Sequence, residues 1–238
     1  MSYAMLKLPQ AVDSLPPIPQ GAPRLVYEAP EPGVNLWIQD NFLPNASEVA
    51  ERCLRHEHWE LGFPHTQETW PGRRFRDALT PGELAHVEDW VKQVTGAKRL
   101  WVGQAPSGAR LDFNVAQSVG AKESGPRPHT DSLGLCTYAA VIYLNPHPEP
   151  DSGTAFYRLR YPNGAVGGNR VSPPHRNLVD ALGVRHLPPQ AWYEEMRVEN
   201  VFNRIVMYKA NLVHSAVRYF GDTIENQRLA AVFFWMAE

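Results

Sequence analysis

Two residues with metal-binding chemistry, His129 and Asp131, stand two positions apart in the segment RPHTDS (127–132), just before the apolar run LCTYAAVIYLN. An isolated His-x-Asp of this kind is most often a polar turn that precedes a strand. In an extended segment, however, both side chains leave the same face, because strand side chains repeat every two residues. A third ligand brought back by the fold would make the pair a metal site.

His214 is the candidate third ligand, and Arg228 is a candidate anchor for an anion. His214 follows the strand-like segment NRIVMYKA (203–210) and a short turn, whereas Arg228 opens the apolar segment RLAAVFFWM. Two imidazoles and one carboxylate form the facial triad of non-haem Fe(II) sites, which leaves positions open for a co-substrate and O₂. A buried arginine needs an anionic partner, which a cofactor could supply.

The elements that must position these residues are mostly short strands. From residue 99 onward the segments are short, rich in β-branched and aromatic residues, and separated by Gly, Pro and Asn, which is typical of strands. A strand is also expected within 34–44 and a helix within 45–59. The firmest helix spans about 80–95, because Thr80 and Glu83 can form a capping box and Gly96 can end it.

This order predicts an α+β fold whose β half closes as a jelly roll or barrel. Residues 1–33 form a proline-rich arm that either lies extended on the body or is partly disordered. Residues 34–238 are expected to form a single domain with a β core at about 99–238. The interval 161–195 has loop composition and weak helical patterning, so we expect an inserted lid over the site.

The order of these motifs resembles the Fe(II)/2-oxoglutarate-dependent dioxygenases, most closely the prolyl-hydroxylase-like branch and its small, functionally unassigned bacterial members. In that branch the strand after His-x-Asp ends in Tyr-Leu-Asn. A Gly-Gly-x-x-x-Phe stretch follows, and an Arg or Lys opens the strand after the distal His. Over roughly residues 110–236 this chain has Tyr143-Leu144-Asn145, Ser152-Gly153-Thr154-Ala155-Phe156, His214 and Arg228.

The resemblance implies a double-stranded β-helix, a jelly-roll or cupin-like barrel with supporting N-terminal helices. It also implies Fe(II) held by His129, Asp131 and His214, and 2-oxoglutarate as co-substrate. Its distal carboxylate would pair with Arg228, assisted by Tyr143, which could otherwise be an ordinary core aromatic residue. With O₂, such an enzyme hydroxylates an unactivated C–H bond and releases succinate and CO₂. An amino acid, a peptide-borne residue or a natural-product intermediate all fit as substrate.

Two departures from the family pattern bear on the site. Ser152 replaces the first glycine of the pair, and the gap of 14 positions between His214 and Arg228 is longer than usual. That gap leaves Arg218 as an alternative anchor, although Arg228 lies on the strand pattern and Arg218 lies in the turn. The filled Asp131 position argues against halogenation, for which the family leaves that position as Gly or Ala.

Three further arginines are candidates for gripping an anionic substrate. Arg74 and Arg76 stand in the segment WPGRRFRDAL, and Arg158 stands in the predicted strand GTAFYRLR. A segment such as the first is more often a solvated turn. The remaining histidines are more simply surface or core residues than ligands.

Two interpretations from other classes remain open. A cupin-like module could bind a metal or small ligand without turnover, and a triad hydrolase or isomerase could dispense with 2-oxoglutarate. The net charge of −2 gives no reason to expect nucleic acid as a partner. With two cysteines, no CxxC spacing and no apolar run long enough to span a bilayer, the chain is expected to be soluble and cytoplasmic, and no membrane partner is expected.

Overall fold

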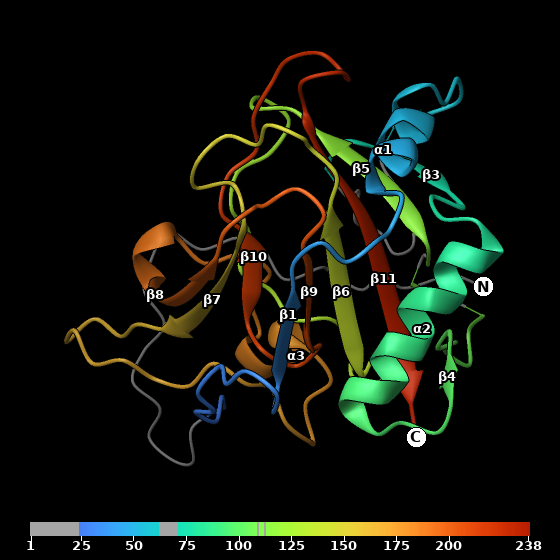
Figure 1. Ribbon diagram of the computed structural model, residues 1–238. Helices are drawn as coiled ribbons and strands as arrows, with labels where there is room; N and C mark the ends of the chain where they lie inside the picture. The colour runs from blue at the N-terminus through green and yellow to red at the C-terminus, as the bar shows by residue number, and fades with distance from the viewer. Residues whose placement is uncertain (1–23, 62–70, 109, 112) are drawn as a thin grey trace, which may run out of the picture.

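The computed structural model describes residues 24–61, 71–108, 110–111 and 113–238, and its strands form two antiparallel sheets (Figure 1). The large sheet contains β1 (Leu36–Gln39), β2 (Glu60–Leu61), β3 (Arg73–Arg76), β4 (Leu100–Trp101), β5 (Val115–Val119), β6 (Tyr138–Tyr143), β9 (Ile205–Lys209) and β11 (Arg228–Ala237). The small sheet contains β7 (Thr154–Leu159), β8 (Trp192–Val198) and β10 (His214–Ala216). The large sheet runs in the order β1-β9-β6-β11-β5-β3-β2, with β4 also paired to β11, and the small one runs β10-β7-β8.

The helices are α1 (Ala46–Leu54), α2 (Pro81–Thr95) and α3 (Leu178–Leu182), with a 3₁₀ turn η1 at Pro189–Ala191. The capping prediction for α2 is confirmed. The Thr80 side chain accepts a hydrogen bond from the Glu83 backbone N–H, and the Glu83 carboxylate accepts one from the Thr80 backbone N–H at 2.8 Å. Gly96 ends the helix at φ 75°, a left-handed conformation that glycine adopts without steric cost.

The large sheet separates two apolar layers. On one face, Phe233 and Trp235 of β11 pack with buried residues of α1 and α2, among them Val49 and Val87, and Figure 1 shows α2 lying across that side of the sheet. The alternate residues of β11, such as Val232, belong to the other layer, together with Phe156 of the small sheet. Helices α1 and α2 therefore cover one face, and the other face is available to line a cavity.

The coarse fold prediction is confirmed, because the chain is mixed α/β with mostly antiparallel strands and few helices. Within the described ranges the paired strands make two separate sheets, so closure into a barrel remains a prediction. The large sheet also contains strands that lie before the predicted β core at about 99–238. Strands β1 to β3 precede residue 99 and hydrogen-bond into the large sheet through β9 and β5.

Two segments differ from their sequence patterns. Residues 73–76 form strand β3 rather than a solvated turn, because they pair with β5, and the Arg74 side chain is only 2% exposed. The weak helical pattern after residue 177 yields only the five residues of α3. From residue 192 the chain instead forms β8, whose pairing with β7 prevails over the local helical preference.

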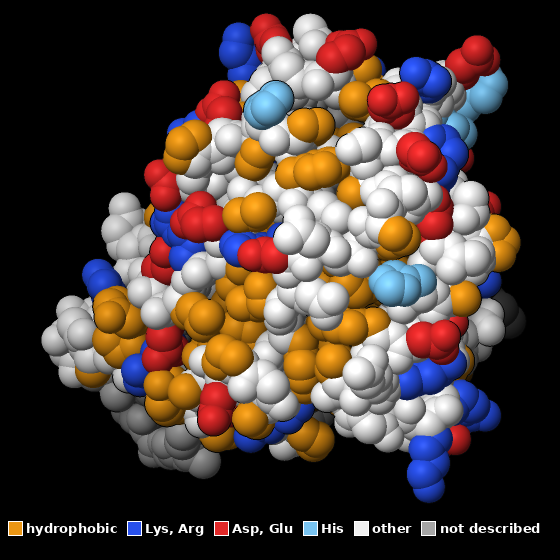
Figure 2. All heavy atoms as spheres, in the orientation of Figure 1, with side chains coloured by type: hydrophobic (Ala, Val, Ile, Leu, Met, Phe, Trp, Pro, Cys, Tyr) orange, Lys and Arg blue, Asp and Glu red, His pale blue; other side chains and the backbone are white. Residues whose placement is uncertain are grey.

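The proline-rich arm is described from residue 24, and residues 1–23 lie outside the described part. Leu25 is buried, and the Val26 N–H donates to the Arg170 carbonyl, so the end of the arm packs on the body. Figure 2 shows apolar side chains gathered in the middle of one face of the molecule. Val34, which precedes β1, and Ile38 of β1 are exposed. None of the described helices has the length and apolar character needed to cross a membrane.

Candidate metal centre and its cavity

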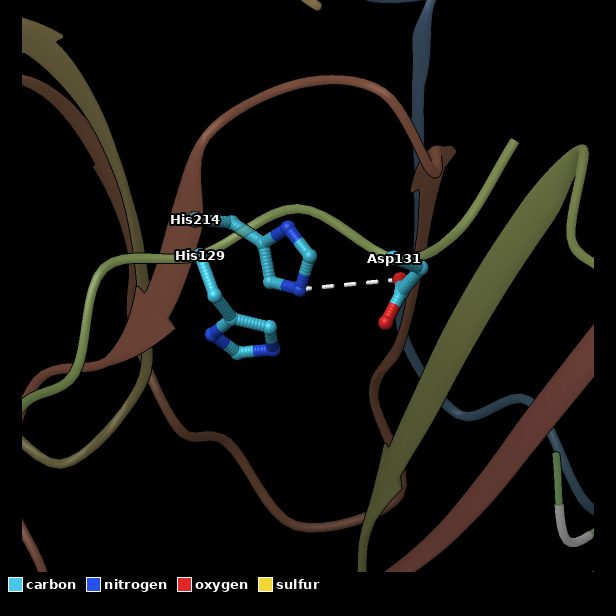
Figure 3. A group of neighbouring side chains, drawn as sticks. All are labelled: His129, Asp131 and His214. Atoms are coloured by element: carbon cyan, nitrogen blue, oxygen red, sulfur yellow. Dashed lines mark ion pairs between the residues drawn. The ribbon is translucent and has the colours of Figure 1, made fainter. Parts of the chain in front are cut away.

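His129, Asp131 and His214 converge from two separate parts of the chain (Figure 3). One ligand atom from each residue lies within 4.8 Å of the others, and His214 Nε2 stands 3.8 Å from Asp131 Oδ2. Backbone hydrogen bonds hold the segments that carry the three residues together. The His129 and His214 backbones exchange bonds of 3.0 and 2.9 Å, and the Asp131 N–H donates to the Ala210 carbonyl at 2.9 Å. The predicted triad is thus one cluster in space.

Both imidazole rings are oriented by a backbone carbonyl. His129 Nδ1 lies 2.8 Å from the Arg127 carbonyl oxygen, and His214 Nδ1 lies 2.9 Å from the Leu212 carbonyl oxygen. A carbonyl oxygen only accepts, so Nδ1 carries the proton and Nε2 keeps its lone pair. Metal-bound histidines are usually held in this way, with the second nitrogen donating to a carbonyl or carboxylate.

The charges of the cluster are not balanced by the protein. Asp131 Oδ2 is buried and makes no hydrogen bond in the described structure, and burial raises the pKa of Asp131 to about 7. Burial, and then the charge of His129, lower the pKa of His214 well below its usual value. An unsatisfied carboxylate oxygen beside two imidazole Nε2 atoms fits a divalent cation, which would supply the missing charge.

The cluster opens into a cavity of about 910 Å³. Arg228 lines the same cavity and is 4% exposed. Its Nε donates to the Ser152 carbonyl at 2.9 Å, and no described carboxylate lies within 4.0 Å of its guanidinium. The desolvated cation on β11 therefore has no anionic partner among the described residues.

Aromatic and hydroxyl groups surround Arg228. The guanidinium carbon lies 5.3 Å from the Tyr143 ring centroid and 5.8 Å from that of Tyr219. The Tyr143 hydroxyl does not line the cavity itself, but it is 2.8 Å from the Thr154 hydroxyl, which does. Burial raises the pKa of Tyr143, and the charge of Arg228 opposes that rise. Tyr143 thus contacts Arg228 through its ring and positions the Thr154 hydroxyl, which lines the cavity.

Gly153 allows β7 and β8 to approach closely beside this group. A Cβ at position 153 would lie 1.9 Å from the Val198 carbonyl oxygen, so Gly153→Ala must push the two strands apart. We expect a loss of roughly 1–3 kcal/mol in unfolding free energy. In thermal unfolding each kcal/mol lowers the midpoint by roughly 2–4 °C. Gly125→Ala, which meets nothing within 4 Å, is the control, and equal midpoints for the two variants would contradict the packing argument.

The structure does not bring the other candidate arginines to the cavity wall. Arg218, the alternative anchor, is half exposed and pairs with Glu149. Arg158 donates to the Gly167 carbonyl at 2.8 Å and stacks on Tyr27, which directs its guanidinium away from the site. Arg76 is exposed on β3, and Arg74 is buried in the large sheet opposite Gln117.

Part of the predicted insertion lies over the cavity. Residues 176–180, 183, 185 and 186 line it, and two hydrogen bonds tie this stretch to the metal-ligand segment. The Leu178 N–H donates to the Thr130 hydroxyl at 2.9 Å, and the Leu133 N–H donates to the Arg176 carbonyl at 2.8 Å. This covering segment (176–186) is therefore hydrogen-bonded directly to Thr130, which lies between His129 and Asp131, and to Leu133, which follows them.

Several cavity residues were not singled out from the sequence. The ring centroid of Tyr208, on β9, lies 4.3 Å from that of His214. The two-residue alternation of strand side chains was the sequence signal that could have placed Tyr208 on the cavity side. Gln117 and Tyr219 also line the cavity, as do Arg127 and Arg176. Adjacency to His129 could have drawn attention to Arg127, whereas no local signal marks Arg176.

A protein family and several solved structures are similar to this chain. A family described as "Family of unknown function (DUF6445)" matches residues 24–228, and no curated protein matches the sequence. Solved structures that are similar include a Pseudomonas putida prolyl-4-hydroxylase, at 13% identity over 85% of this chain and 93% of that one, with a TM-score of 0.47. The α-ketoglutarate-dependent carbocyclase SnoK of nogalamycin biosynthesis is similar at 16% identity over 85% of this chain and 79% of that one, with a TM-score of 0.47. Streptomyces hygroscopicus HygX with nickel, 2-oxoglutarate and hygromycin B is similar at 17% identity over 84% of this chain and 82% of that one, with a TM-score of 0.46.

Proposed function

Since the chain belongs to the DUF6445 family of unknown function, we propose from its own site that it is an Fe(II)/2-oxoglutarate-dependent oxygenase built on a double-stranded β-helix. The observation that carries the proposal is the pairing of two unbalanced groups in one cavity. The cluster of His129, Asp131 and His214 lacks a cation, and Arg228 lacks an anion. A ferrous ion chelated by a dicarboxylate would satisfy both groups.

Each residue then has a defined task. His129 and His214 would donate Nε2 lone pairs to the metal, and Asp131 would supply the charged oxygen ligand. Arg228 would pair with the distal carboxylate of 2-oxoglutarate, with Thr154 beside it. The apolar walls formed by Leu135, Val232 and Phe234 would exclude water.

Iron bound there would supply O₂ activation. In the overall reaction, substrate R–H, O₂ and 2-oxoglutarate give R–OH, succinate and CO₂, which accounts for all atoms and electrons. The finer proposal is that the product is hydroxylated at an unactivated carbon. The substrate would be an amino acid, a peptide-borne residue or a natural-product intermediate.

Turnover of labelled 2-oxoglutarate tests the proposal. With Fe(II) and O₂, the protein should convert [1-¹⁴C]2-oxoglutarate into ¹⁴CO₂ and succinate, slowly alone and faster with substrate. Asp131→Ala is the matched control, since it removes one ligand of the triad. Binding of iron and 2-oxoglutarate with no turnover under any condition would instead favour a binding module. Metal binding without affinity for 2-oxoglutarate would favour a triad enzyme of another kind.

We also expect the covering segment to be a lid, because residues 176–180, 183, 185 and 186 line the cavity and the segment is hydrogen-bonded to the triad segment. Trypsin should cut after Arg176 and Arg185 in the apo protein, and iron with 2-oxoglutarate should slow both cuts several-fold. Cutting after Arg55, at the exposed end of α1, is the internal control. If the ligands slow all three cuts equally, or none, the lid proposal is wrong.

A further inference from the structure

The cavity is larger than a metal ion and a five-carbon co-substrate require. Its volume of about 910 Å³ is near the top of the range of about 300–1,000 Å³ in which proteins enclose drug-sized ligands. Several walls are apolar, formed by Leu111, Leu135, Val141, Val232 and Phe234. The remaining space therefore suits a molecule with a substantial apolar body.

The charged residues of the wall are predominantly cationic. Among the described residues that line the cavity, four are arginines and two are aspartates. One of each, Arg228 and Asp131, is assigned to the co-substrate and the metal. The second aspartate, Asp180, accepts a hydrogen bond from the Arg176 backbone N–H at 2.9 Å and lies 4.0 Å from His175 Nδ1. Its charge is thus partly engaged at the start of α3.

Three arginines of the wall remain, and because Arg185 already has an interaction partner, Arg127 and Arg176 are the two available cations that the proposed chemistry does not use. Both are exposed to solvent while lining the cavity, so they stand at its open side. The described structure gives neither guanidinium an ion pair, a hydrogen bond or a stacking aromatic ring. Isolated surface arginines are ordinarily just solvated, but two that line one cavity without a described acidic partner are available to an anion.

The backbone of each arginine is fixed close to the metal ligands. The Arg127 carbonyl orients His129, and the Arg127 N–H donates to the Ser215 hydroxyl at 2.8 Å. The Arg176 carbonyl accepts from the Leu133 N–H at 2.8 Å. An anion held between these two side chains would therefore place the rest of its molecule against the apolar walls beside the triad.

We infer that the substrate carries an anionic group, a carboxylate or a phosphate, that Arg127 and Arg176 bind at the open side of the cavity while an apolar body enters it. Calling this ligand the substrate rests on the proposed function, but the anion can bind without a metal in the site. Arg176 belongs to the covering segment and Arg127 to the triad segment. The anion would therefore also draw the covering toward the triad.

Three small probes of similar shape test this inference: benzoate, phenyl phosphate and the neutral benzamide. Their affinities are measured by calorimetry, first on the protein loaded with Ni(II) and 2-oxoglutarate and then on the metal-free protein. At least one anion should bind about tenfold more tightly than benzamide, the scale of a charge-assisted hydrogen bond. The tighter of the two anions identifies the preferred head group.

The double variant Arg127→Gln/Arg176→Gln should lose this preference in both forms of the protein. Arg55→Gln, an exposed arginine at the end of α1, should keep it. The inference is overturned if benzamide binds as well as the anions, if the preference survives in the double variant, or if no probe binds. Failure of the oxygenase proposal would look different: Ni(II) and 2-oxoglutarate would fail to bind together, while the metal-free protein would still prefer anions.

Discussion

Arg228→Ala is expected to weaken 2-oxoglutarate binding by roughly 30- to several-thousand-fold. Removing one member of a desolvated charge pair costs about 2–5 kcal/mol, and each 1.4 kcal/mol is a factor of ten. The premise is structural: Arg228 is 4% exposed, lines the cavity, and has no carboxylate partner among the described residues. The affinity is measured by titrating 2-oxoglutarate into Ni(II)-loaded protein in a calorimeter.

Two matched variants sharpen this result. Arg228→Lys keeps the charge but loses the planar fork, so its affinity for 2-oxoglutarate should fall between wild type and Arg228→Ala. Arg218→Ala should change the affinity little, because Arg218 is half exposed and pairs with Glu149 outside the cavity. A large loss in the Arg218 variant with none in Arg228→Ala would move the anchor to the other arginine.

Asp131→Ala is expected to abolish 2-oxoglutarate turnover while leaving the fold intact. Changes to residues that only orient a metal ligand typically cost about 10–100-fold, so loss of the charged ligand itself should exceed about 100-fold. Iron content per chain and ¹⁴CO₂ release measure this effect. Retention of iron and full turnover in the variant would contradict the triad assignment.

Asp131→Asn provides a readout independent of activity. Burial raises the folded-state pKa of Asp131 to about 7, above the ordinary value of 3.8. The metal-free wild-type protein should therefore lose stability as pH rises from about 4 to about 7, because the folded state resists ionisation of this group. Asp131→Asn should remove that part of the pH dependence in thermal unfolding, and an unchanged profile would mean that the carboxylate is not desolvated.

The local signals in the sequence predicted local structure well. Helix α2 has the capping box and terminal glycine that Thr80, Glu83 and Gly96 indicated. The structure brings His129, Asp131 and the candidate third ligand His214 into one cluster, as their spacing and order along the chain predicted. These features depend on neighbours within a few residues or on a recurring motif order, which a sequence displays directly.

Features that depend on distant pairing were missed. Residues 73–76 are rich in arginine and resemble a surface turn, yet they pair with β5 as a strand in which Arg74 and Phe75 are buried. Similarly, β8 is a strand because β7 pairs with it, although its sequence followed a weak helical pattern. The position of Arg176 on the cavity wall depends on hydrogen bonds from the covering segment to Thr130 and Leu133. The composition of the segment does not indicate these bonds.

The anaerobic visible spectrum of the ferrous protein tests the central claim most directly. If the triad holds Fe(II) and the cavity admits 2-oxoglutarate as a chelate, adding the co-substrate should produce a metal-to-ligand charge-transfer band. That band should saturate at one 2-oxoglutarate per iron, be absent in Asp131→Ala, and require much higher 2-oxoglutarate in Arg228→Ala. An iron-loaded protein that develops no such band, at any concentration of 2-oxoglutarate, would contradict the oxygenase proposal.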